Sequence, residues 1–186
     1  MLRRALAVSL LAASSAAAEP PLPFDLGGAY ALTNQFGETR TEADPEGHAQ
    51  LLFFGYANCL NICSAALPLM ADVVDALAED GIAVTPVMIT VAPDQDTVET
   101  MGAPLAEIHP DFIGLTGDRA TLQTAYDAFA IEVEPLFQDP EYGWVYAHGS
   151  FVHLLDGAGD MLTLLPPILD AERSADIVRG YLAPRG

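Results

Sequence analysis

The chain has 186 residues, 51% of them hydrophobic, which is enough for one domain with a substantial core. Its 26 acidic residues outnumber seven basic ones, all of them arginine, and the formal net charge is −19. This charge excludes a general affinity for nucleic acid phosphates or anionic lipid, and it suits either a solubilising surface or a basic protein partner.

The N-terminus has the pattern of a secretory signal peptide. Two arginines open it, residues 5–13 are apolar, and an Ala-x-Ala cleavage motif ends at Ala18. The alternative is an uncleaved inner-membrane anchor, but the longer stretch from Ala5 to Ala18 has only fourteen residues, three of them serines, and a spanning helix needs about 20. We therefore expect a periplasmic protein with a signal peptide at 1–18, one domain at 19–186 and no membrane span in the mature chain.

After a proline-rich lead-in, the first half of the mature chain alternates strand and helix patterns. Residues 30–33 and 38–40 flank an Asn-Gln-Phe-Gly turn and predict a β-hairpin. Residues 48–56 are mostly apolar and carry apolar side chains on both faces, which is typical of a central strand in a parallel sheet. Apolar residues at helical spacing predict a helix over 65–77, and a second apolar strand follows over 82–91.

The second half continues this alternation and ends with a strand pair and a helix. A helix is expected from Pro93, with Asp96 as its N-cap. The remaining elements, in chain order, are a strand at 112–115, a helix at 117–129, an irregular aromatic-rich segment at 131–146, strands at 148–156 and 161–165, and a closing helix at 170–182. This order predicts a thioredoxin-like α/β fold with an N-terminal β-hairpin and an insertion before the last strand pair.

The chain has only two cysteines, Cys59 and Cys63, and they stand where the predicted central strand gives way to a helix. A helix N-terminus favours the thiolate form of cysteine, and residues at i and i+4 share one face of a helix. Such a pair can bind a soft metal, exchange disulfides or close a structural loop. In an oxidising compartment it becomes a disulfide unless a reductant or a metal prevents this.

A metal at this pair would need a further ligand. Soft thiolates select Cu(I), Zn or iron–sulfur centres, and two thiolates leave each of these with too few ligands. Histidine is the expected donor, and the chain has four. We interpret His48, His109 and His153 as structural residues. His148 follows the irregular segment, and its position alone is equally compatible with a ligand and with a structural residue.

Four segments resemble the Sco/SenC family of copper-binding assembly factors. FFGYANCLNICSAALPLM is similar to the family's aromatic-Gly-Tyr/Phe-x-x-Cys-Pro-x-x-Cys pattern, and ITVAPDQDT and IGLTG resemble its next two landmarks. AHGSFVHLLDGAG resembles the family's Asp-His-Ser, strand and Asp-Pro-x-Gly turn, and this alignment puts the ligand histidine at His148. The resemblance covers about residues 24–182.

The resemblance implies a copper ion bound by Cys59, Cys63 and His148. It also implies delivery of copper to the CuA centre of cytochrome c oxidase, with subunit II or another exported copper protein as the partner. Alternatively, Cys59 and Cys63 are a catalytic pair that reduces the cysteines of the receiving protein and is itself restored by a thioredoxin-like reductant.

Four positions depart from the family pattern, although none of them removes a metal-binding side chain. A proline and three acidic residues are replaced, in chain order, by Leu60, Asn61, Ala92 and Ala147. The loss of negative charge at 61 and 147 weakens the binding of a cation and changes its redox potential. The change to Ala147 also removes an orienting partner for His148.

The residues and the resemblance together favour a copper chaperone over the alternatives. A structural disulfide would close a five-residue loop and stabilise the fold by only about 2 kcal/mol. A peroxidase would use Cys59 as its attacking thiolate, but the sequence lacks the arginine-and-threonine setting of an activated peroxidatic cysteine. A thiol-disulfide oxidoreductase is the main alternative.

Overall fold

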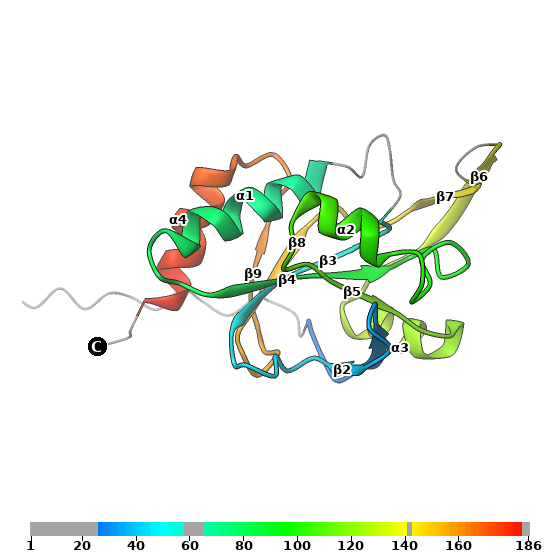
Figure 1. Cartoon of the computed structure of the whole chain (residues 1–186), viewed down its shortest axis with the longest axis horizontal. Helices are drawn as coiled ribbons and strands as arrows, with labels where there is room; N and C mark the ends of the chain where they lie inside the picture. Colours follow the sequence, from blue (N-terminus) through cyan, green and yellow to red (C-terminus); the bar gives the residue numbers. More distant parts are fainter. Residues whose placement is uncertain (1–25, 58–64, 141–142, 184–186) are drawn as a thin grey trace, which may run out of the picture.

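A seven-stranded mixed sheet forms the centre of the computed structural model, which describes residues 26–57, 65–140 and 143–183. The strand order is β2-β1-β5-β4-β3-β8-β9 (Figure 1). The bounds are β1 Ala31–Asn34, β2 Thr39–Thr41, β3 Ala49–Gly55, β4 Val84–Thr90, β5 Ile113–Thr116, β8 Val152–Leu155 and β9 Met161–Leu165. The predicted signal peptide at 1–18 lies outside the described residues.

The middle of the sheet is parallel and its flanks are antiparallel. β3 pairs in parallel with β4, and β4 with β5, so the carboxyl ends of these three strands meet at one edge. β1 runs antiparallel to β5 and β2, and β8 runs antiparallel to β3 and β9. This arrangement agrees with the predicted α/β order and with the predicted N-terminal hairpin, which is formed by β1 and β2.

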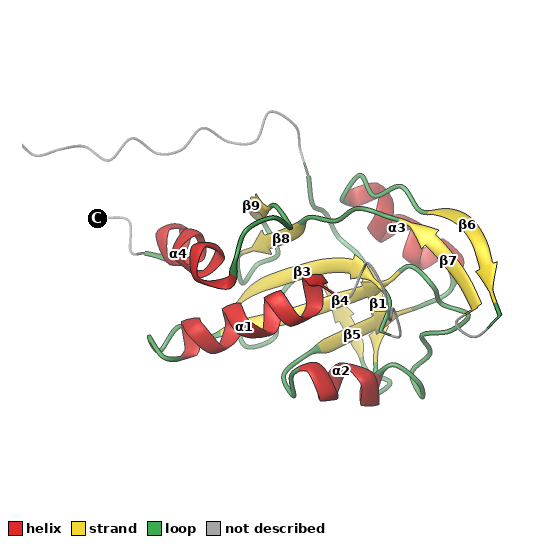
Figure 2. Ribbon diagram, turned by 90° about the horizontal axis from the view of Figure 1, so that it is seen from above, coloured by secondary structure: helices red, strands yellow, loops and turns green. Residues whose placement is uncertain are grey.

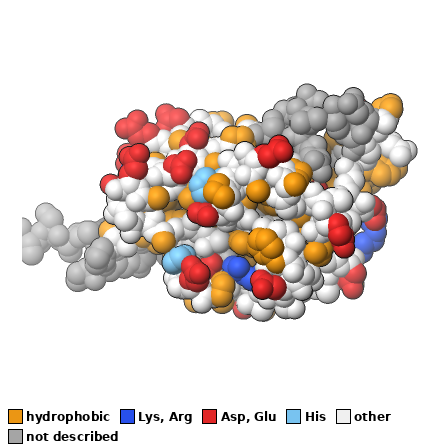
Figure 3. Space-filling view, viewed as in Figure 1, with side chains coloured by type: hydrophobic (Ala, Val, Ile, Leu, Met, Phe, Trp, Pro, Cys, Tyr) orange, Lys and Arg blue, Asp and Glu red, His pale blue; other side chains and the backbone are white. Residues whose placement is uncertain are grey.

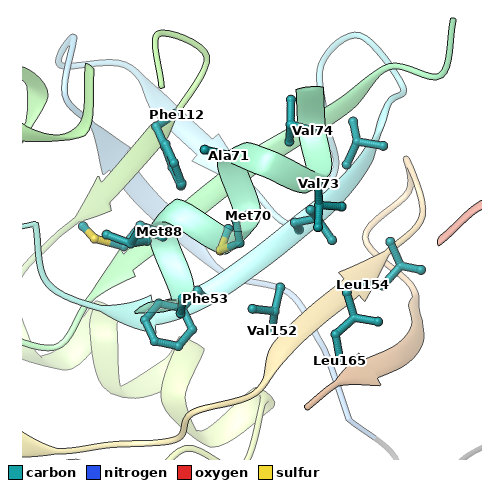
Figure 4. Packing of buried hydrophobic residues seen from close by; sticks show 14 of the residues in the cluster. Phe53, Met70, Ala71, Val73, Val74, Met88, Phe112, Val152, Leu154 and Leu165 are labelled. Atoms are coloured by element: carbon teal, nitrogen blue, oxygen red, sulfur yellow. The ribbon is translucent and has the colours of Figure 1, made fainter. Parts of the chain in front are cut away.

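Helices cover both faces of the sheet, which is why β3 is buried along its whole length. α1 (Ala66–Ala78), α2 (Gly102–Ile108) and α4 (Ala171–Leu182) lie on one face, and α3 (Arg119–Ala128) lies on the other (Figure 2). Side chains alternate along a strand. Phe53 therefore packs with α1 and α4 in one hydrophobic cluster (Figure 4), while Phe54 packs with α3 in a second.

Residues 131–146 are not irregular as predicted. They contain an antiparallel pair, β6 (Glu134–Asp139) and β7 (Gly143–Ala147), which forms a two-stranded sheet of its own. The register shifts between Pro135 and Phe137, and a bulge of this kind breaks the period-two alternation by which a strand is recognised in a sequence.

The strand predicted to begin at His148 begins at Val152. β8 pairs with β3 only over Gln50–Leu52, so residues 148–151 extend past the end of this ladder. His148 consequently lies in the connection between β7 and β8 and not in a strand.

The helix predicted from Pro93 is also wrong. Residues 93–101 form turns and bends, and α2 begins at Gly102. Asp96 does not cap a helix, because its carboxylate accepts hydrogen bonds from the Ala57 N–H and the Thr90 hydroxyl. These partners lie far away in the sequence, so local capping patterns do not reveal them.

Gly157 provides a test of the packing between two loops. A Cβ at this position would contact the Gly47 carbonyl oxygen and lie 2.7 Å from its carbon, and neither backbone atom can move aside easily. We predict that Gly157→Ala lowers the free energy of unfolding by about 1–3 kcal/mol, measured by urea denaturation. Gly180→Ala is the control, because a Cβ there has nothing within 4 Å and α4 should gain up to about 1 kcal/mol. Equal effects at both positions would contradict this packing.

Candidate functional site

The cysteine segment connects β3 to α1. β3 ends at Gly55, Ala57 is the last described residue after it, and α1 begins at Ala66. Cys59 and Cys63 fall within residues 58–64, outside the described part of the chain. The strand before them and the helix after them are as predicted, so the segment starts from the carboxyl edge of the parallel strands.

His148 lies at this same edge. Its half-buried ring packs edge-on against Phe53, with ring centroids 5.7 Å apart, and against Tyr56, at 6.0 Å. Tyr56 stands three residues before Cys59. The structure therefore brings His148, 89 positions after Cys59, to the point where the chain leaves β3 for the cysteine segment.

The protein backbone orients His148. Its Nδ1 donates a hydrogen bond to the Gly149 carbonyl oxygen at 2.9 Å. Burial lowers the pKa of His148 below its ordinary value, while hydrogen bonds to the backbone of Gly149 and Phe54 oppose this shift. The ring is thus neutral at pH 7, the form in which histidine binds metals. A carbonyl here does the orienting that an acidic side chain at position 147 would otherwise do.

His153 belongs to the core and not to the site. It lies opposite Leu52 in the β3–β8 ladder and is 3% exposed. Its ring packs edge-on against Phe54 and Phe129, with centroids 5.7 Å and 5.4 Å away. Burial lowers its pKa to about 4. These contacts support the interpretation of His153 as structural.

The other two histidines have partners elsewhere. His48 precedes β3 at the end opposite Gly55, and its Nδ1 is 3.5 Å from a Glu46 carboxylate. The Nε2 of His109 is 3.3 Å from a carboxylate oxygen of Asp75 in α1. Among the four histidines, His148 has the contacts that place it beside Tyr56.

Asp96 is a buried residue at the same edge that sequence reasoning assigned to another role. Its Oδ2 accepts hydrogen bonds from the Ala57 N–H at 3.0 Å and from the Thr90 hydroxyl at 2.7 Å. Burial raises the pKa of its carboxyl group. The sequence carries a signal for this residue in the segment ITVAPDQDT, but that signal does not reveal the contact with Ala57.

The β6–β7 hairpin leads directly into His148 and exposes large apolar side chains. Leu136 and Phe137 are each 56% exposed and Trp144 is 43% exposed, and Phe151, just after the histidine, is 44% exposed. Acidic side chains are prominent on the face that Figure 3 shows and basic ones are sparse. No described helix has the length and apolarity to cross a bilayer.

Comparison with known proteins gives consistent matches. A family model described as SCO1/SenC matches residues 18–183. The SCO2-like protein of Rickettsia felis is 34% identical over 140 residues, or 74% of this chain and 67% of that protein. The human mitochondrial SCO2 homolog is 31% identical over 158 residues, which span 84% of this chain and only 59% of the human protein.

A solved structure supports the same relationship. The crystal structure of Arabidopsis thaliana ScoI with copper bound is similar at a TM-score of 0.79 and 25% identity, covering 84% of this chain and 98% of that one. This likeness confirms the predicted fold class.

The buried His153 predicts a pH dependence of stability. Because its folded pKa is about 4 and its unfolded pKa is near 6.5, the unfolded chain binds the extra proton first as the pH falls. The free energy of unfolding therefore has its full contribution from neutral His153 above pH 6.5, and it declines by about 3 kcal/mol as the pH falls towards 4. We predict that His153→Gln has a shallower loss of unfolding free energy between these pH values, measured by denaturant titration. An unchanged slope in His153→Gln would contradict the assignment.

Proposed function

Because the chain belongs to the SCO1/SenC family, we propose that it is an exported copper chaperone that acts in the assembly of cytochrome c oxidase. The observation that carries the proposal is the position of His148, packed against Tyr56 where the chain enters the cysteine segment. Copper in the similar ScoI structure supports the choice of metal.

We assign the copper ligands to the thiolates of Cys59 and Cys63 and the imidazole of His148. Thiolate and neutral imidazole are donors that suit copper. The described first turn of α1 carries no acidic side chain. No negative charge in that turn therefore repels thiolates near the N-terminus of the helix, which carries the positive end of the helix dipole. Three ligands leave Cu(I) accessible to a fourth donor, which suits exchange with the thiols of a receiving protein.

A second function, thiol-disulfide reduction, is favoured by the fact that the chain has only these two cysteines, four positions apart. The two thiolates would reduce a disulfide of the receiving protein to two thiols and become a disulfide themselves. A thioredoxin-like reductant outside the cytoplasm would then supply two electrons to restore them. In this case His148 is not required for the reaction.

The partner we propose is subunit II of cytochrome c oxidase or another exported copper protein. A receiving protein that approaches His148 also meets the β6–β7 hairpin, with exposed Leu136, Phe137 and Trp144. The strong negative charge of the chain favours a partner with basic residues around an apolar centre.

Copper binding tests the proposed site. The reduced protein without residues 1–18 should bind one equivalent of Cu(I) in competition with a chromophoric chelator. His148→Ala should weaken this binding by more than the roughly 10–100-fold that the loss of an outer-shell partner costs. In the Cu(II)-loaded protein, His148→Ala should also change the Cys-to-Cu(II) charge-transfer band.

His109→Ala is the matched control, because that histidine contacts Asp75 and not Tyr56; it should bind copper like the wild type. If His148→Ala also binds like the wild type while reduction of a subunit II disulfide proceeds normally, the chaperone proposal fails and the reductase is supported.

The hairpin predicts a separate effect on transfer. Replacing Leu136, Phe137 and Trp144 together by serine should slow Cu(I) transfer to the soluble domain of subunit II about tenfold or more, while the affinity for copper stays unchanged. Replacing Phe36 and Ile168, which lie elsewhere and are even more exposed, should leave the transfer rate intact. The measurement is stopped-flow transfer at several salt concentrations, and equal slowing by both sets would contradict this role of the hairpin.

A further inference from the structure

Asp96 is a fully buried acid at the edge where the cysteine segment begins. Its carboxylate is 0% exposed, and its Oδ2 accepts both the Ala57 N–H and the Thr90 hydroxyl. Ala57 stands two residues before Cys59. A side chain from the connection between β4 and α2 therefore holds the backbone just ahead of the first cysteine.

Hydrogen bonds to β4, to β5 and within its own connection fix Asp96 itself. Its N–H donates to the Ala92 carbonyl at 2.9 Å, and its own carbonyl accepts the Thr116 hydroxyl of β5 at 2.7 Å. Thr90 at the end of β4 is held in turn, because its hydroxyl accepts the Ala92 N–H and its carbonyl accepts the Tyr126 hydroxyl of α3 at 2.6 Å. Asp96 is thus held by β4 and β5, and α3 holds the Thr90 residue that contacts its carboxylate.

The Ala57 N–H donates to Asp96 just beyond the end of the sheet ladder. The last paired residues of β3 and β4 are Gly55 and Thr90, and the Gly55 carbonyl accepts the Val91 N–H at 2.7 Å. Beyond this point the chain leaves the sheet. The bond from Ala57 to Asp96 then sets the direction in which the chain leaves β3.

Stability does not account for a carboxyl group at this place. A buried acid is costly unless all its acceptors are satisfied, and among the described residues the Asp96 Oδ1 has no hydrogen-bond partner. A neutral residue would avoid this cost. Unsatisfied buried polar groups in native proteins often coincide with functional constraints.

We propose that Asp96 is a positioning residue for the thiol chemistry of Cys59 and Cys63. By holding the Ala57 N–H it fixes the start of the cysteine segment relative to the edge where His148 lies. This inference rests on the proposed function for its link to copper, but the effect on the thiol pair does not require the metal.

The test compares three variants in two measurements. The first is the equilibrium constant of the Cys59–Cys63 disulfide with reduced glutathione, which needs no copper, and the second is Cu(I) affinity. Asp96→Ala removes the acceptor of the Ala57 N–H. It should change the equilibrium constant with glutathione by about tenfold or more, equivalent to about 30 mV for a two-electron couple. Cu(I) affinity should fall by a similar factor.

Asp96→Asn keeps an oxygen that can accept the Ala57 N–H, so its glutathione equilibrium constant and its Cu(I) affinity should both be close to those of the wild type. Asp44→Ala is the matched control. Asp44 is also a buried acid, and its side chain accepts the N–H groups of Glu46 and His48 at the opposite end of β3. Its loss should lower stability and leave both measurements unchanged. If Asp96→Ala does not fold, Asp96→Ser, whose side chain is too short to reach Ala57, replaces it.

Wild-type values in Asp96→Ala, or an equal shift in Asp44→Ala, would overturn the proposal. An Asp96→Asn variant that behaves like Asp96→Ala would also overturn it, because the charge and not the hydrogen bond would then be responsible. If the wild type binds no copper but Asp96→Ala still shifts the glutathione equilibrium, the chaperone proposal fails and the positioning role stands.

Discussion

The parallel pairing of β3 with β4 is the constraint on which the rest of the structure depends. It sets Gly55 opposite Thr90, so the segments that follow β3 and β4 leave the sheet side by side at one edge. One of them enters the cysteine segment, and the other brings Asp96 to the Ala57 N–H. Antiparallel pairing of β8 with β3 adds the third part, because the connection before β8 places His148 against Phe53 and Tyr56.

The sequence was informative where structure is set by patterns of apolar residues. The largely apolar sequence of β3 predicted a strand buried on both faces, and the spacing of apolar residues in α1 predicted its buried side. Predictions failed where distant contacts decide the structure. Asp96 has the sequence pattern of a helix cap, but its carboxylate accepts hydrogen bonds from the Thr90 hydroxyl and the Ala57 N–H instead. The bulge in β6 hides a strand pattern, and the ladder with β3 ends before His148.

The site can be predicted from the sequence only in part. The spacing of Cys59 and Cys63 indicates soft-metal or redox chemistry, but it does not choose a histidine, and the resemblance was needed to select His148. The fold then separates the candidates physically, since His153 is enclosed by Phe54 and Phe129 while His148 lies at the edge. The fold also shows a backbone carbonyl at Gly149 orienting the ring, which explains how a histidine after Ala147 can keep one orientation.

The central claim is that two sulfurs from the cysteine segment and one nitrogen from His148 bind the same copper ion. X-ray absorption at the copper edge of the Cu(I)-loaded protein tests it most directly. The account predicts a first coordination shell of two sulfur atoms and one nitrogen atom in the wild type, with the nitrogen lost in His148→Ala. A shell of sulfur alone in the wild type, or an unchanged nitrogen in the variant, would contradict the account.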